Sequence, residues 1–164
     1  MDNAPEITQR ADQPYAGISS WVTMAAIGSV ADRIPEIFSW LGARGIAPAG
    51  PPFFRYHVID MERQLQVEVG VPVVSAAEDD GVIRAGTLPA GRFATMTHTG
   101  APDTLAAATA RLLDWARERE LAWDMSPMEA GEHWGCRVEF YLTDPAAQPD
   151  ASKWRTQLAF RLAD

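Results

Sequence analysis

The residue with the clearest chemical potential in this sequence is Glu139, a carboxylate in the middle of an apolar stretch. It belongs to the segment His133–Leu142, HWGCRVEFYL, whose side chains alternate in character. This alternation predicts one strand with an apolar face and a mixed face. The apolar face holds Trp134, Cys136, Val138, Phe140 and Leu142, and the mixed face holds Gly135, Arg137, Glu139 and Tyr141. A carboxylate at this position must face water, a cation or a cavity that accommodates charge, because burial of an unpaired charge is costly.

Two interpretations of Glu139 are open at this point. In the first, it is an exposed strand residue that pairs with Arg137 or with a basic residue of a neighbouring strand. In the second, it lies inside an aromatic cavity, where it recruits a cation or acts as a general acid or base with a raised pKa.

Aromatic side chains supply candidate walls for such a cavity. Tyr56, in PPFFRYHVID, offers a ring and a hydroxyl, although most strand tyrosines serve sheet packing, and Phe54 shares its face by alternation. Most of the six tryptophans are expected in the core. Trp21 and Trp134 lie on predicted strands and are candidate cavity liners, but Trp134 needs a bulge at the following glycine to reach the Glu139 face. Rings beside a carboxylate suit a flat, lipophilic cation.

Other site chemistries have little support in the sequence. His57, His98 and His133 fall on separate predicted strands without metal-ligand spacing, so we expect no metal site. The single cysteine, Cys136, excludes an internal disulfide and is expected to be inert packing. No nucleophile elbow and no glycine-rich phosphate loop is found, so neither a hydrolytic triad nor a bound cofactor is expected.

Composition narrows the class of partner. The chain has 164 residues, 47% of them hydrophobic, and a formal net charge of −8. Nucleic-acid binding is not expected, because phosphate contact needs a basic surface. No apolar run approaches the roughly 20 residues of a membrane span, and the first residues do not resemble a signal peptide. A cytoplasmic protein is therefore the expectation, and its oligomeric state is left open.

The predicted elements repeat in order. Helical spacing predicts helices over Val30–Arg44 and Pro102–Glu120, with Pro35 placing the first helical turn later, near Asp32. Strands are predicted at Glu6–Arg10, Tyr15–Thr23, Phe53–Asp60, Leu65–Val74, Val82–Leu88, Arg92–Thr99, His133–Leu142 and Trp154–Leu162. The connection Ala122–Glu132 is expected to be irregular. The order strand–helix–strand–strand, given twice, predicts one α+β domain over 1–164 with pseudo-repeats at about 5–75 and 81–164 and an antiparallel sheet.

Several of these stretches together resemble a known family. PPFFRYHVID, LQVEVGVPV, GRFATMTHTGAPDTLAAATARLLDWA and CRVEFYLTDPAAQPDASKW are similar to the GyrI-like effector-binding domain, which also occurs as the ligand-sensing part of bacterial multidrug regulators. The resemblance implies tandem strand–helix–strand–strand repeats that form one curved antiparallel sheet with two helices and a central ligand cavity. It also implies that Glu139 matches a mid-strand glutamate that meets cationic, lipophilic compounds. Tyr56 and Tyr141 match aromatic positions beside it.

The resemblance leaves three functions open. The favoured one is a cytosolic binding protein for aromatic, lipophilic, often cationic compounds, acting in xenobiotic sensing or sequestration without a DNA-binding domain. The second is a small hydrolase of strained-ring natural products, in which Glu139 and Tyr141 would be the catalytic residues. The third and weakest is a gyrase-modulating protein interaction through an acidic surface, since the acidic run is limited to Glu78–Asp80.

Overall fold

A computed structural model describes residues 2–76 and 78–164 of the chain. The strands in this part are β1 (Glu6–Arg10), β2 (Gln13–Val22), β3 (Phe53–Ile59), β4 (Leu65–Pro72), β5 (Arg84–Leu88), β6 (Gly91–Thr99), β7 (Met125–Met128), β8 (Gly131–Trp134), β9 (Arg137–Tyr141) and β10 (Arg155–Arg161). The helices are α1 (Ile34–Ala43) and α2 (Leu105–Glu118), with shorter 3-10 segments η1 (Met24–Arg33), η2 (Pro102–Thr104) and η3 (Ala151–Lys153). The fold is α+β, as predicted.

The strands form one antiparallel sheet that curls into a half-barrel. Its order is β1-β6-β10-β9-β3-β4-β2-β5, and β7 and β8 form a hairpin that joins it through β3. Strand β9 therefore lies near the middle of the sheet, between β10 and β3. The predicted pairing of the two strands that follow the first helix is confirmed, because β3 and β4 are antiparallel neighbours.

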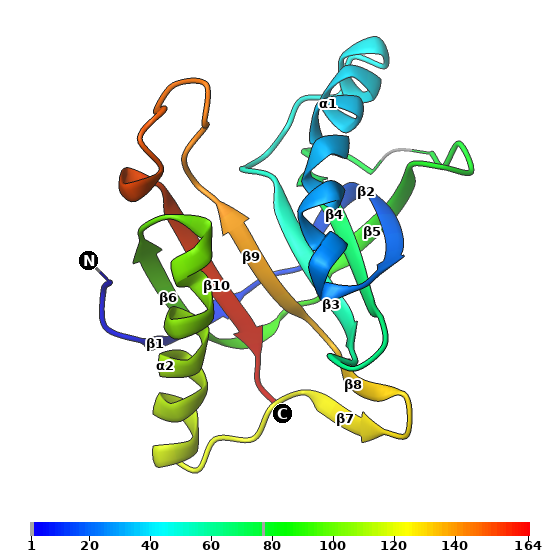
Figure 1. The fold of residues 1–164 in the computed structure, drawn as a ribbon. Helices are drawn as coiled ribbons and strands as arrows, with labels where there is room; N and C mark the ends of the chain where they lie inside the picture. Colours follow the sequence, from blue (N-terminus) through cyan, green and yellow to red (C-terminus); the bar gives the residue numbers. More distant parts are fainter. Residues whose placement is uncertain (1, 77) are drawn as a thin grey trace.

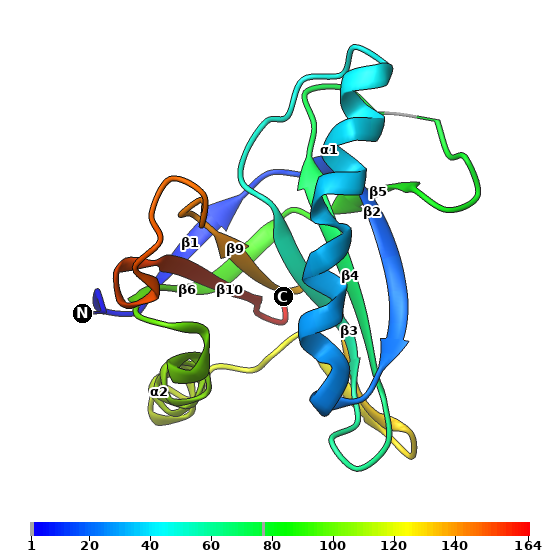
Figure 2. The same cartoon turned by 45° about the horizontal axis from the view of Figure 1, so that its top comes forward.

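Both helices cover the same face of the sheet (Figure 1). Helix α1 packs Ile37, Trp40 and Leu41 against β2, β3 and β4. Helix α2 packs Ala108 and Leu112 against β6 and β10. Figure 2 shows the two helices standing apart, and Figure 1 shows β9 running along the strip of sheet between them. The opposite face holds a separate apolar cluster inside the curl: Tyr15, Phe53, Leu88, Phe93, Cys136, Val138, Phe140 and Ala159.

The first helical region begins with 3-10 geometry rather than α-helix. Residues Met24–Arg33 form η1, and the α-helix starts at Ile34 with Pro35 in its first turn. The expectation of one helix over Val30–Arg44 is thus corrected. Proline lacks an N–H donor, which costs nothing in the first turn of an α-helix, where no carbonyl awaits that donor.

The segment His133–Leu142 is not one continuous strand. Strand β8 ends at Trp134 and β9 begins at Arg137, so the pairing with β3 is interrupted at Gly135 and Cys136. A Cβ atom at Gly135 would collide with the carboxylate of Asp124, which explains why glycine occupies this break. The connection Ala122–Glu132 was expected to be irregular, but it contains β7 and the start of β8.

Candidate functional site

Glu139 lies on the face of the sheet that carries the helices. In the register of the sheet it is opposite Phe54 of β3 on one side and Leu158 of β10 on the other. Only 8% of its surface is exposed. The first interpretation, an exposed strand residue, is therefore wrong, and the carboxylate is a buried group in the middle of the sheet.

Two tyrosine hydroxyls hold this carboxylate. Tyr56 of β3 and Tyr141 of β9 each donate a hydrogen bond to Oε1 of Glu139, both at 3.0 Å. Among the described residues no hydrogen bond reaches the other oxygen, Oε2. The carboxylate is thus fixed through one oxygen, and its second oxygen is free of hydrogen bonds from residues 2–76 and 78–164.

Burial dominates the electrostatics of this group. It raises the pKa of Glu139 above its ordinary value of 4.5, while the hydrogen bonds from Tyr141 and Tyr56 and the charge of Arg137 oppose that rise. Burial and the neighbouring carboxylate also raise the pKa values of Tyr56 and Tyr141, so both remain neutral donors. A carboxyl group with a raised pKa accepts a proton more readily than an ordinary surface carboxylate does.

Phe54 completes an aromatic wall around the carboxylate. Its ring stands edge-on to Tyr141 at 5.2 Å between centroids and lies 6.4 Å from the ring of Tyr56. Edge-to-face geometry of this kind is a favourable arrangement of aromatic quadrupoles. The predicted residues Phe54, Tyr56 and Tyr141 are therefore brought together with Glu139.

Arg137 is a further member of the site. Its guanidinium lies 4.4 Å from the ring centroid of Phe160, 4.7 Å from that of Trp134 and 6.0 Å from that of Tyr56. Its Nε is buried without a hydrogen-bond partner, and burial lowers its pKa. In the described part of the chain Arg137 forms no close ion pair with Glu139. The signal for it was present in the sequence, since alternation places Arg137 on the Glu139 face.

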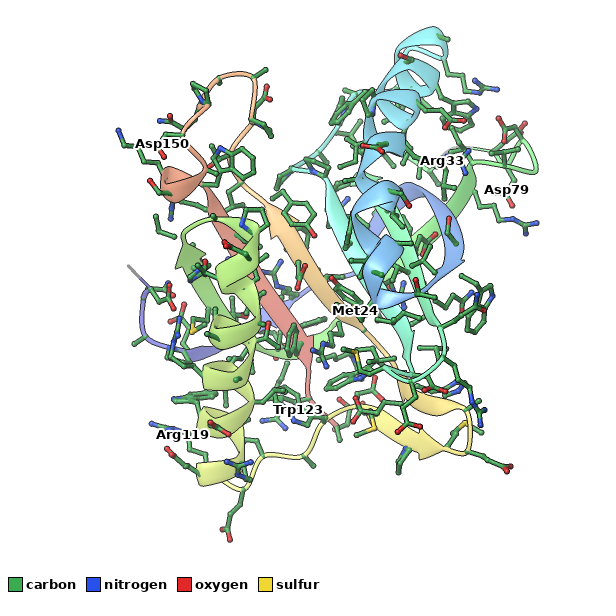
Figure 3. The ribbon with its side chains drawn as sticks, in the orientation of Figure 1. Met24, Arg33, Asp79, Arg119, Trp123 and Asp150 are labelled. Carbon is green, nitrogen blue, oxygen red and sulfur yellow. The ribbon has the colours of Figure 1, made fainter. Side chains whose placement is uncertain are left out.

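The two tryptophans proposed as cavity liners lie in different places. Trp134 is 6% exposed and reaches the site indirectly, through its stacking on Arg137. Its ring also packs on Trp123, which Figure 3 labels at the lower end of the strip between the helices. Trp21 lies near the end of β2, opposite Gln66 of β4, and 55% of its surface is exposed.

Two cavities lie away from the Glu139 cluster. Cavities of about 380 and 460 Å³ are lined by residues that do not include Glu139, Tyr56 or Tyr141. Across residues 2–76 and 78–164, no three His, Cys, Asp or Glu side chains are grouped so as to hold a metal ion. No described helix has the length and apolar character to cross a membrane.

A second buried carboxylate, Glu68, lies on the opposite face of the sheet. Its Oε1 accepts a hydrogen bond from the Tyr15 hydroxyl at 2.6 Å and lies 2.8 Å from Nε2 of His57. Arg55 donates to the same tyrosine hydroxyl and to the carbonyl oxygen of Gly135. This network links β2, β3 and β4 to the break between β8 and β9, and sequence reasoning missed it because its members come from separate strands.

The sequence of residues 3–163 matches the family model of the GyrI-like small molecule binding domain. The chain belongs to the GyrI-like family. Because the match covers nearly the whole chain, membership of this family implies that the protein is a small-molecule binding domain, as the sequence predicted. No curated protein sequence matches the chain.

Solved structures of low sequence identity share the GyrI-like fold. The crystal structure of the EcmrR C-terminal domain has a TM-score of 0.78 and 18% identity, with 98% of each chain covered. In the cryo-EM structure of an EcmrR–DNA complex, the same similarity spans 57% of the EcmrR chain. SAV2435 bound to tetraphenylphosphonium has a TM-score of 0.66 and 9% identity over 98% of this chain and 94% of that one. A hydrolase of Listeria innocua encoded by lin2189 has a TM-score of 0.65 and 10% identity over 97% and 91%.

Proposed function

We propose that this protein binds aromatic, lipophilic, often cationic small molecules, with Glu139 as the counter-group of the guest. The observation that carries the proposal is a buried carboxylate whose Oε1 is held by two tyrosine hydroxyls, while Oε2 accepts no hydrogen bond from the described residues. A positive guest beside Oε2 would recover part of the electrostatic energy that burial costs this group. The SAV2435 structure, with bound tetraphenylphosphonium, supports the choice of guest.

The aromatic wall favours a guest with a diffuse charge. Phe54, Tyr56 and Tyr141 present ring surfaces beside the carboxylate, and such rings attract cations by a further ~0.5–2 kcal/mol. Arg137 lies close enough to act on Glu139 electrostatically. Its positive charge opposes a compact cation more than a large one whose charge is spread over several rings. We therefore expect lipophilic organic cations to bind better than small ammonium ions.

We further infer a role in the bacterial cytoplasm, in sensing or sequestering several unrelated drugs. A cluster of rings around one carboxylate recognises charge and apolar surface rather than a particular shape, which permits several guests. The net charge of −8 disfavours contact with nucleic acid, so the small molecule is the proposed partner.

Binding of tetraphenylphosphonium, measured by calorimetry and by quenching of tryptophan fluorescence, tests the proposal. The neutral comparison ligand is triphenylphosphine oxide, which keeps three of the four phenyl rings and lacks the net charge. We expect Glu139→Gln to weaken tetraphenylphosphonium binding by about tenfold, equivalent to ~1.4 kcal/mol, and to leave the neutral ligand unaffected. Glu62→Gln, at an exposed position, removes the same formal charge and serves as the control. Equal affinity of the cation for the protein and for Glu139→Gln would refute this role of Glu139.

A hydrolase is the second candidate, because the same geometry suits water activation. With Oε1 fixed by the tyrosines, Oε2 is placed to accept a proton from a water molecule. The resulting hydroxide would attack a carbon of a strained ring, the ring bond would break, and a tyrosine hydroxyl would protonate the leaving atom. The tyrosine would then regain a proton from the carboxyl group of Glu139, to which it is hydrogen-bonded. The raised pKa of Glu139 and the similarity to a Listeria hydrolase support this candidate.

Turnover of a strained electrophile separates the two candidates. Styrene oxide, incubated with the protein at neutral pH, should yield its diol faster than in buffer if the hydrolase candidate holds. Glu139→Gln should then abolish turnover, and Tyr141→Phe should slow it. A panel of strained electrophiles that bind without conversion would leave binding as the function.

A further inference from the structure

A second site lies inside the curl of the sheet, on the face opposite Glu139. A cavity of about 380 Å³ is lined there by residues of β1, β6, β9 and β10 and by the connections around them. Its volume lies in the range of small-molecule sites, roughly 300–1,000 Å³. Alternation along β9 turns Val138 and Phe140 toward this cavity and Glu139 away from it. The sheet itself therefore separates the two sites.

Arg10 is the cationic group of this cavity, which we call the Arg10 cavity. Its guanidinium lies 5.2 Å from the ring centroid of Phe140 and 5.8 Å from that of Phe93. Its Nη2 donates to Oε1 of Gln157 at 2.8 Å, whereas its Nε is buried without a partner. Among residues 2–76 and 78–164, Arg10 forms no ion pair with a carboxylate. The guanidinium of Arg10 therefore contacts two aromatic rings and one amide oxygen, and its Nε–H remains available as a hydrogen-bond donor.

The remaining walls of the Arg10 cavity are mostly apolar. They include Ala49, Pro51, Pro72, Leu88, Pro89, Cys136, Val138 and Leu142. Asp12 also lines the cavity, and its Oδ1 accepts the backbone N–H of Ala90 at 2.7 Å. Its carboxylate is thus engaged by the backbone. The combination of one partly buried cation with apolar walls is the reverse of the Glu139 site.

We propose that the Arg10 cavity binds a small carboxylic acid with an apolar body, such as a medium-chain fatty acid or an aryl-alkanoic acid. The carboxylate of the guest would accept hydrogen bonds from the guanidinium, and the body would lie on Phe93 and Phe140. A charged acceptor is the best partner for spare guanidinium donors, because charge-assisted hydrogen bonds are stronger than neutral ones. This inference is independent of the function proposed for Glu139.

Calorimetric titration of the full chain with octanoate and with octanamide tests this inference. The two ligands share the same chain and differ in charge, so octanoate should bind at least about tenfold more tightly. Arg10→Gln should remove that difference. Arg84 is an exposed arginine of β5. Arg84→Gln removes the same charge and should leave the difference in affinity between octanoate and octanamide unchanged. Inorganic phosphate should bind more weakly than octanoate, since it lacks the apolar body.

Two further variants keep the test decisive. Ala49→Trp, at the exposed rim of the Arg10 cavity, should weaken binding of both octanoate and octanamide, even if Arg10→Gln does not fold. Glu139→Gln should not change octanoate binding. Equal affinity for octanoate and octanamide, or phosphate binding as tight as octanoate binding, would overturn the proposal. A loss of octanoate binding in Glu139→Gln would place the octanoate site on the Glu139 face of the sheet, which would also overturn the proposal.

Discussion

The hydroxyl of Tyr56 on β3 lies 3.0 Å from Oε1 of Glu139 on β9, although 83 residues separate them in the sequence. This bond forms because β3 and β9 are neighbours in the sheet, with Phe54 directly opposite Glu139. The hydroxyl therefore reaches across the strand boundary to a carboxylate that the rest of the site keeps from solvent.

The stability of the fold should depend on pH through Glu139. Burial raises the pKa of Glu139 in the folded protein above its ordinary value of 4.5. At a pH between the ordinary and the folded pKa, the native state therefore binds more protons than the unfolded chain. Stability contributed by the protonated form is present at low pH and declines as pH rises toward the folded pKa. Urea unfolding from pH 4 to 8 should show that Glu139→Gln gains stability relative to the wild type as pH rises. A constant difference across this range would contradict the raised pKa.

The two tyrosines should act as one unit. Tyr56→Phe or Tyr141→Phe removes one of two donors to the same oxygen, at a cost of about 1–3 kcal/mol in the free energy of unfolding. Loss of both donors leaves the carboxylate without a hydrogen bond, so the double variant should lose more than the sum of the single variants. Denaturant unfolding at pH 7 of the three variants measures this. Strict additivity would show that the hydroxyls act separately.

Arg137 should oppose cation binding. Arg137→Met keeps an apolar side chain against Trp134 and Phe160 and removes the positive charge that acts on Glu139. The affinity for tetraphenylphosphonium should then rise by roughly tenfold or less, in line with a coupling of about 1 kcal/mol. Triphenylphosphine oxide affinity is the control and should not change. A fall in cation affinity would mean that Arg137 positions the carboxylate rather than competing with the guest.

Close packing inside the curl should make Gly70 intolerant of a side chain. A Cβ at Gly70 would lie 2.6 Å from the ring of Phe53, which is fully buried. Gly70→Ala should therefore destabilise the fold by about 1–3 kcal/mol. The matched control is Gly42→Ala in α1, where the added Cβ meets nothing within 4 Å. That variant should stabilise the helix by up to ~1 kcal/mol, and both effects are measurable as shifts in the thermal midpoint.

The break at Gly135 shows how a correct local pattern can lead to a wrong element. Alternation through His133–Leu142 predicted one strand and placed Trp134 on the face opposite Glu139. The structure divides the segment into β8 and β9, and Trp134 stacks on Arg137. The collision that a side chain at Gly135 would have with Asp124 involves a residue outside this segment. Local periodicity carries no information about such a neighbour.

The sequence alone determined which residues share a face. Glu139, Arg137 and Tyr141 lie two residues apart on one strand, and Phe54 and Tyr56 do so on another, because side-chain direction in a strand is set by local geometry. The tertiary structure decided which strands are neighbours and so which faces meet. Tyr56 reaches Glu139, and Arg10 reaches Phe140, only through pairings between distant segments. Those pairings depend on backbone hydrogen bonding and core packing over the whole sheet, which no short stretch of sequence encodes.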